Sequence, residues 1–296
     1  MKTQTSIWAY PWDLLDEGVE AALDTMAAMG MNAVSIAAAY HSGKFMSPRN
    51  SKQRICFPEG GVVYFRPSEA KFRNIPIKPC ASHLAVDDVF GAALRHSAKV
   101  GLQLTAWFVG THNSRLAANH PEFAVRNAFG DAYKYALCPS CKPVHAYLTT
   151  LLDDFLSQYS VHAVELESFG YLGFYHGYHH EAYSVSLGPF EQALLALCFC
   201  PACKRMGIEA GVDVEKLRLE ICATIDDRLA DPSLAEVSFE DSVLELMDYV
   251  QSRSDLSRFL LRRLEIVTGM ISDLSLIAHL RGAKIYSTGP VFVRSS

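Results

Sequence analysis

Three cysteines lie within six residues of the stretch CFCPACKRMG, at Cys198, Cys200 and Cys203. Thiolates are zinc ligands, and a Cys-x-Cys-x2-Cys turn can wrap three of them around one ion, at about 2.3 Å for each Zn–S bond. The fourth ligand must come from another segment, and ALCPSCKP offers Cys138 or Cys141. We therefore predict a structural zinc site, because four thiolates leave no open position for a reacting water. The alternative is that these thiols are small, buried core side chains.

Two carboxylates alternate with apolar residues in the run AVELESFG, at Glu165 and Glu167. In a β-strand, residues i and i+2 share a face, so both glutamates point one way while Val164 and Leu166 point the other way. The carboxyl ends of parallel strands carry the chemistry of α/β enzymes, and adjacent carboxylates raise one pKa, which suits a general acid. We predict a catalytic role for both. The alternative is that one glutamate pairs with Arg or Lys and neither contacts a substrate.

The segment YLGFYHGYHHEAY, directly after that run, interleaves tyrosines with His176, His179, His180 and Glu181. Aromatic and imidazole groups together can stack on sugar rings and form hydrogen bonds with hydroxyl groups, so we predict a carbohydrate-binding loop. A second metal site is the alternative interpretation. The ends of two earlier strands carry further candidates for the same binding site: Trp8, Tyr10, Tyr40 and His41.

Short β-rich runs alternate with amphipathic helical stripes along the whole chain, which predicts parallel strands joined by helical crossovers in one α/β domain spanning residues 1–296. The expected strands are 5–9, 32–40, 102–110, 161–170 and 283–288. The expected helices are 17–30, 86–101, 144–155, 189–206, 214–230 and 256–280. This order predicts a (β/α)8 TIM-barrel type that is incomplete, truncated at its C-terminal end, because closure needs eight strands. An open edge strand favours pairing with another chain, such as a homo-oligomer.

The composition excludes several classes of protein. The chain of 296 residues has a formal net charge of -5, with 27 basic and 32 acidic side chains spread along it, so we expect no nucleic acid partner. The N-terminal MKTQTSIWAYPWD has no signal-peptide core, and no window is apolar enough to span a membrane, so we expect a cytoplasmic protein without a membrane partner. No dinucleotide fingerprint or phosphate loop is present.

The order of these motifs resembles the family 42 β-galactosidases. It runs HPEFAVRNAFGD, ALCPSCKPVHAYL, VELESFGYLG and CFCPACKRMGIEAGVDVEKLR, over about a third of the chain. The resemblance implies a (β/α)8 barrel, with Glu167 as the acid/base. It also implies zinc bound by an earlier cysteine and the later three: Cys138, Cys198, Cys200 and Cys203. This chain departs from the family at Leu166, where the family has Asn, and in the seventh strand, which carries the family's nucleophile and is not found here.

Three functional hypotheses follow. The first is a zinc-stapled glycoside hydrolase-like protein that acts on or binds carbohydrate, with Glu167 as proton donor. The second is a metal-dependent isomerase or lyase of the TIM-barrel type, in which a divalent ion is held by Glu165, Glu167, His179, His180 and Glu181. The third is a degenerate barrel that binds carbohydrate without catalysis, which the missing distal strands favour.

Overall fold

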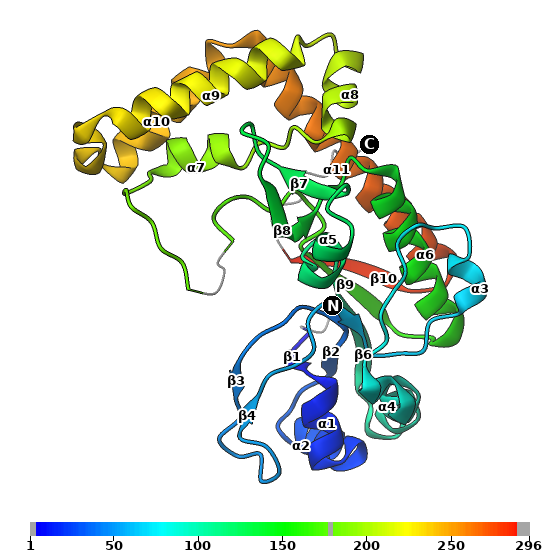
Figure 1. Ribbon diagram of the computed structural model, residues 1–296. Helices are drawn as coiled ribbons and strands as arrows, with labels where there is room; N and C mark the ends of the chain where they lie inside the picture. The colour runs from blue at the N-terminus through cyan, green and yellow to red at the C-terminus, as the bar shows by residue number, and fades with distance from the viewer. Residues whose placement is uncertain (1–3, 177–179, 289–296) are drawn as a thin grey trace.

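A parallel β-sheet organises the chain, and the computed structural model describes residues 4–176 and 180–288 (Figure 1). Five parallel strands lie side by side in the order β1-β2-β6-β9-β10. Their bounds are β1 (Ser6–Ala9), β2 (Ala33–Tyr40), β6 (Gln103–Val109), β9 (Ala163–Glu167) and β10 (Lys284–Thr288). They correspond to the five expected strands, so the predicted α/β arrangement with a parallel sheet is confirmed.

The sheet stays open within the described residues. Its edges are β1 and β10, and no strand pairing joins them. The short strand β5 (Val62–Val63) adds one antiparallel pairing to the end of β2. The described part of the chain therefore agrees with the expected incomplete barrel and does not form a closed eight-stranded one.

Four helices flank the strands in two packed pairs (Figure 1). α2 (Val19–Ala28) packs against α4 (Val89–Val100), and α6 (Lys142–Gln158) packs against α11 (Ser254–Leu280). The helix expected over 17–30 corresponds to α2, whereas α1 (Pro11–Glu17) was not predicted; it precedes α2, and Gly18 separates the two. Gly18 has a φ of 88°, a conformation that glycine adopts readily and other residues adopt only with strain.

The apolar face of the sheet forms the main core. Phe155 of α6 meets Phe65, Phe90 and Phe108 edge-on, with ring centroids 5.2, 4.9 and 5.2 Å away. Leu166 of β9 belongs to the same core and is 1% exposed. Aromatic rings that meet edge-on contribute about 0.5–1.5 kcal/mol per pair beyond their buried area. This core fixes β9, and with it the opposite face of that strand.

A small unit between β6 and α6 escaped the sequence patterns. α5 (Ser114–Asn119) packs on an antiparallel hairpin of β7 (Ala124–Arg126) and β8 (Ala132–Leu137). Cys138 directly follows β8, so the hairpin positions the first cysteine of the predicted cluster. The remaining short elements are β3 (Phe45–Met46), β4 (Ile55–Cys56), α3 (Glu69–Phe72) and the 3₁₀ turns η1 (His83–Asp87) and η2 (Pro232–Glu236).

A helical arm, defined here as residues 189–251, extends away from the sheet (Figure 1). It contains α7 (Pro189–Leu195), α8 (Pro201–Glu209), α9 (Val214–Ala230) and α10 (Phe239–Gln251). The single helix expected over 189–206 is wrong, because the chain breaks between α7 and α8. Cys200 is extended, with ψ of 164°, as the residue before a proline prefers, and Pro201 then starts α8. No helix among the described residues is long and apolar enough to cross a membrane.

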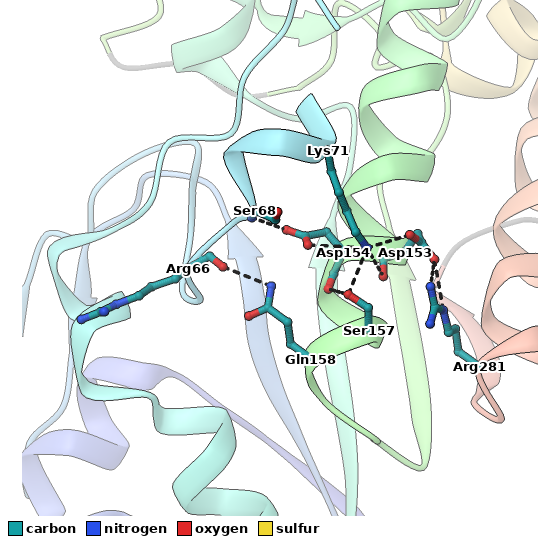
Figure 2. A network of polar contacts seen from close by, with 8 residues as sticks. All are labelled: Arg66, Ser68, Lys71, Asp153, Asp154, Ser157, Gln158 and Arg281. Carbon is teal, nitrogen blue, oxygen red and sulfur yellow. Dashed lines mark hydrogen bonds and ion pairs between the residues drawn. The ribbon is translucent and has the colours of Figure 1, made fainter. Parts of the chain in front are cut away.

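A polar network ties α3 to α6 and to the turn after α11, as Figure 2 shows. The carboxylate of Asp154 is 1% exposed and accepts the backbone N–H of Ser68 at 2.8 Å. The adjacent Asp153 is more exposed and binds Lys71 at 2.8 Å and Arg281 at 2.6 Å. The buried Asp154 thus satisfies a backbone donor and also lies 3.7 Å from the Nζ atom of Lys71, whereas the more exposed Asp153 makes ion pairs that solvent screens.

Replacing Asp154 with alanine should therefore lower the free energy of unfolding by about 1–3 kcal/mol, because the Ser68 N–H loses its acceptor. The matched change Asp153→Ala should cost less than about 1 kcal/mol, since exposed ion pairs contribute little. Urea denaturation of both variants measures the difference. An equal or larger loss in Asp153→Ala would contradict this account of the network.

Candidate functional site

The polar face of the sheet holds the two predicted glutamates. Parallel pairing sets Trp107 of β6 beside Glu165 of β9 and places Val109 beside Glu167. Because side chains alternate along a strand, Glu165 and Glu167 share this face, while the buried Leu166 points into the core. The predicted alternation therefore agrees with the structure.

Glu165 lies deep in this face and is 7% exposed. The indole N–H of Trp8 donates to its two carboxylate oxygens at 2.9 and 3.1 Å. The hydroxyl of Ser35 on β2 donates to Oε2 at 2.5 Å. A buried carboxylate is destabilising unless it is hydrogen-bonded, so these two donors allow it to remain inside the sheet.

Glu167, two residues further along β9, is partly exposed at the carboxyl end of the strand. The indole N–H of Trp107 donates to its Oε2 at 2.7 Å. Burial raises the pKa of Tyr10, and the nearby charge of Glu167 adds to this effect. Burial also raises the pKa of Tyr40, and the charge of Glu167 again adds to the effect. Glu167 is thus held by one donor and keeps an accessible side, as a proton-transferring group requires.

Aromatic side chains surround the two carboxylates and form an aromatic wall, defined here as Trp8, Tyr10, Tyr40 and Trp107. Trp107 lies at the centre, with ring centroids 5.9 Å from Trp8, 5.7 Å from Tyr10 and 4.9 Å from Tyr40. The hydroxyls of Tyr10 and Tyr40 are 3.2 Å apart. Trp8 is 60% exposed, so its ring is free to contact a ligand. Rings with polar edges of this kind suit a ligand that has both apolar faces and hydroxyls.

Three histidines meet beside the wall. The ring of His41 stacks on Tyr40 at 4.2 Å and on His112 at 4.4 Å. The Nε2 atoms of His112 and His176 are 3.0 Å apart. Burial lowers the pKa of His112 to about 3, and the neighbouring His176 and His41 lower it further. His112 was missed by the sequence analysis, although it follows β6 by three residues, the place where α/β enzymes carry functional side chains.

The other predicted residues of the binding loop are His179, His180 and Glu181. His180 and Glu181 are exposed, and His179 lies outside the described residues. Burial and the charge of His41 lower the pKa of His176, while the charge of Glu181 acts in the opposite direction. Within residues 4–176 and 180–288, these groups and the two sheet glutamates do not converge as a metal-binding cluster. The structure therefore joins His176 to the wall, and the described residues alone do not form the second metal site.

Four cysteines do converge. The sulfurs of Cys138, Cys198, Cys200 and Cys203 lie within 4.8 Å of one another, and all four residues are buried. The Sγ atom of Cys138 is 3.5 Å from Cys203, 3.6 Å from Cys200 and 3.8 Å from Cys198. Cys141 is also buried but stands outside this set. Such a cluster could hold a metal ion.

The surroundings act differently on the thiols of the cluster, since burial raises the pKa of Cys138 well above its ordinary value. The backbone N–H of Arg126 on β7 donates to the sulfur of Cys198 at 3.3 Å. Cys200 is the N-cap of α8, where the helix dipole stabilises negative charge. Hydrogen bonds from the other thiols, first Cys138, hold the pKa of Cys200 far below its ordinary value. The break between α7 and α8 thus turns the chain so that the sulfur of Cys200 meets Cys138 at the end of β8.

No protein-family model and no curated protein matches this sequence. Solved structures do. The β-galactosidase from the psychrophilic Marinomonas ef1 aligns with a TM-score of 0.52 at 11% identity, over 96% of this chain and 37% of that chain. The catalytic domain of β-amylase from Paenibacillus polymyxa aligns with a TM-score of 0.48 at 12% identity, over 95% of this chain and 65% of that chain. The PgaB (BpsB) glycoside hydrolase domain from Bordetella bronchiseptica aligns with a TM-score of 0.46 at 14% identity, over 97% of this chain and 65% of that chain.

The chain thus spans less than two thirds of the length of each of these three structures. At such low identity the similarity to the β-galactosidase establishes the fold alone, an α/β sheet of the TIM-barrel type. The three structures reported are all glycoside hydrolases.

The depressed pKa of His112 predicts a pH dependence of stability. The folded protein protonates His112 only near pH 3, whereas an unfolded histidine does so near 6.5. Between these values the unfolded state binds more protons, so the free energy of unfolding should fall as pH decreases through this window. His112 can contribute at most about 1.4 kcal/mol per pH unit to this dependence, because one imidazole binds at most one proton.

Urea denaturation at several pH values, compared between wild type and His112→Gln, isolates this contribution. Between about pH 6.5 and 4, the free energy of unfolding should depend less steeply on pH in His112→Gln than in wild type. His120→Gln, which changes a histidine outside the cluster, should keep the wild-type dependence. Parallel curves for wild type and His112→Gln would show that the His112 environment has been misjudged.

Proposed function

We propose that this protein is a glycosidase-like carbohydrate-binding protein in which Glu167 is the proton donor. The observation that carries the proposal is the position of Glu167. It stands at the carboxyl end of β9 and accepts one hydrogen bond from Trp107, whose ring contacts those of Tyr10 and Tyr40. A carboxyl group held on one side and accessible on the other, next to stacked rings, suits proton transfer to a glycosidic oxygen.

The other predicted residues take supporting roles in this proposal. Glu165 belongs to the same site and holds Trp8 and Ser35 in place through its carboxylate. A sugar ring packs against the wall and exchanges hydrogen bonds with the phenols and imidazoles around it. The binding residues are Trp8, Tyr10, Tyr40, His41 and His176, with His179, His180 and Glu181 contributed by the loop after β9.

We also propose that the cysteine cluster binds a structural zinc ion. Four sulfurs at about 2.3 Å from one tetrahedral ion lie about 3.8 Å from each other. The three distances from Cys138, 3.5, 3.6 and 3.8 Å, are close to this value. The ion would connect the helical arm to the end of β8. The family 42 resemblance is part of this proposal, and the order of the cysteines supports it.

A specific observation favours a second candidate, carbohydrate binding without hydrolysis. The strand register shows which residues of the five parallel strands lie on the polar face. Within the described residues, the only carboxylates at these positions are Glu165 and Glu167. Glycoside hydrolysis ordinarily uses a pair of carboxyl groups flanking the bond. Glu165 is 7% exposed and its carboxylate accepts hydrogen bonds from Trp8 and Ser35, so Glu167 has no second exposed carboxyl group beside it on the described strands.

Replacing Glu167 with glutamine should reduce kcat on aryl glycosides by about 100-fold or more, because general acid catalysis contributes about 10²–10⁴-fold. The loss should be largest for poor leaving groups and small for nitrophenyl groups that leave without protonation. Kinetics on a panel of aryl glycosides measures this pattern. Glu240→Gln, on the exposed start of α10, is the matched control and should behave as wild type.

Unchanged turnover in Glu167→Gln, or an equal loss for every leaving group, would remove Glu167 as the proton donor. If wild type hydrolyses no glycoside but binds sugars by calorimetry, the second candidate holds instead.

Elemental analysis should find about one zinc per chain. Cys200→Ser should lose the metal and lower the free energy of unfolding by more than about 4 kcal/mol, as loss of a structural metal does. Cys141→Ser should keep the metal because its sulfur lies outside the converging set. Cys80→Ser, a partly buried thiol away from the cluster, is the control for thiol loss. Metal retained in Cys200→Ser, or lost in Cys141→Ser, would overturn the ligand assignment.

A further inference from the structure

The open sheet leaves a cavity of about 310 Å³ beside Glu165. Both edge strands contribute to it, although β1 and β10 stand at opposite ends of the strand order. The sheet must therefore curl until its two edges face one space. The cavity is lined by Gln4, Ser6, Ile7, Trp8, Thr105, Glu165 and Tyr286.

The lining combines the Glu165 carboxylate, which has no ion pair among the described residues, with the unpartnered hydroxyl of Thr105. Glu165 is 7% exposed and receives hydrogen bonds from Trp8 and Ser35, but no cation among the described residues pairs with it. Lys284 occupies the same face of β10 and is exposed, without an ion pair to this carboxylate. The buried hydroxyl of Thr105 has no hydrogen-bond partner in the described part of the chain.

An ammonium group is the ligand chemistry that this lining lacks. Buried charges are ordinarily paired with an opposite charge, and a carboxylate with two neutral donors still has capacity to accept from a cation. The indole of Trp8 lines the cavity and is 60% exposed while its N–H is fixed on Glu165, so a ligand bound at that carboxylate also lies next to this ring. A neutral sugar hydroxyl would leave the charge of Glu165 without a counter-ion.

We propose that this cavity binds the primary ammonium group of a small polar ligand, and that the carbohydrate is an amino sugar. The identification of the ligand as a sugar rests on the proposed function, whereas the ammonium site rests on the cavity itself. A volume of about 310 Å³ lies at the small end of ligand sites and suits a single sugar ring. Glu167 stands two residues along the same face, roughly 7 Å away along the strand. Glu167 does not line the cavity, which lies on the amino-terminal side of this residue along the strands.

The test compares glucosamine with glucose, which differ by an ammonium group in place of one hydroxyl. Calorimetry on the whole chain at about pH 6, below the ordinary pKa of an amine, should give at least about 10-fold tighter binding of glucosamine. Glu165→Gln should abolish this preference. Because Glu165 also holds Trp8 and Ser35, the second variant is Trp8→Leu, an exposed position, which should reduce glucosamine affinity with the fold intact by circular dichroism. Glu240→Gln should retain the preference.

Equal binding of the two sugars, binding of neither, or a preference that survives both Glu165→Gln and Trp8→Leu would overturn the inference. These results are separable from the fate of the proposed function. A preference for glucosamine without hydrolysis of any glycoside would reject only the proposed catalytic activity. Hydrolysis of neutral glycosides without that preference would reject only the ammonium site.

Discussion

Two hydrogen bonds between indole N–H groups and carboxylates organise the polar face of this protein. Trp8 binds Glu165 and Trp107 binds Glu167, at 2.9 and 2.7 Å. Each bond satisfies a carboxylate that would otherwise be unfavourable inside a sheet, and it also fixes the plane of the indole ring. The aromatic wall and the charged groups are therefore one unit, and moving either member displaces the other.

The open sheet gives that unit its access to solvent. In a closed barrel the interior is filled by layers of side chains, so a carboxylate at the position of Glu165 would be a core residue. Here the edges β1 and β10 face a cavity instead. The apolar face behind β9 holds the strand rigid through Phe155 and its neighbours. A rigid strand with a reachable polar face can present functional groups even where the described strands do not complete a barrel.

Sequence patterns predicted the parts of the structure that depend on local periodicity. Alternation in AVELESFG correctly placed Glu165 and Glu167 on one face, and the cysteine spacing correctly identified residues that converge. The split between α7 and α8 was missed because the apolar run through Leu195 and Leu197 continues across it, while Pro201 and the cysteines end it.

Other features depend on contacts that no local pattern encodes. Cys138 and Cys141 are three residues apart, and the β7–β8 hairpin and the start of α6 decide which sulfur faces the cluster. His112 joins His41 and His176 only because three strand ends meet in space. The pairing of Trp8 with Glu165 spans 157 positions, so only the folded sheet reveals it.

The most direct test of this account is a crystal structure of the Glu167→Gln protein with a bound disaccharide, since the substitution preserves the shape of the site and blocks proton transfer. The account predicts a sugar ring against Trp107 and Tyr40, with the glycosidic oxygen within hydrogen-bond distance of the side chain at position 167. A disaccharide bound elsewhere on the protein, or a polar face of the sheet that stays free of sugar at saturating concentration, would contradict it.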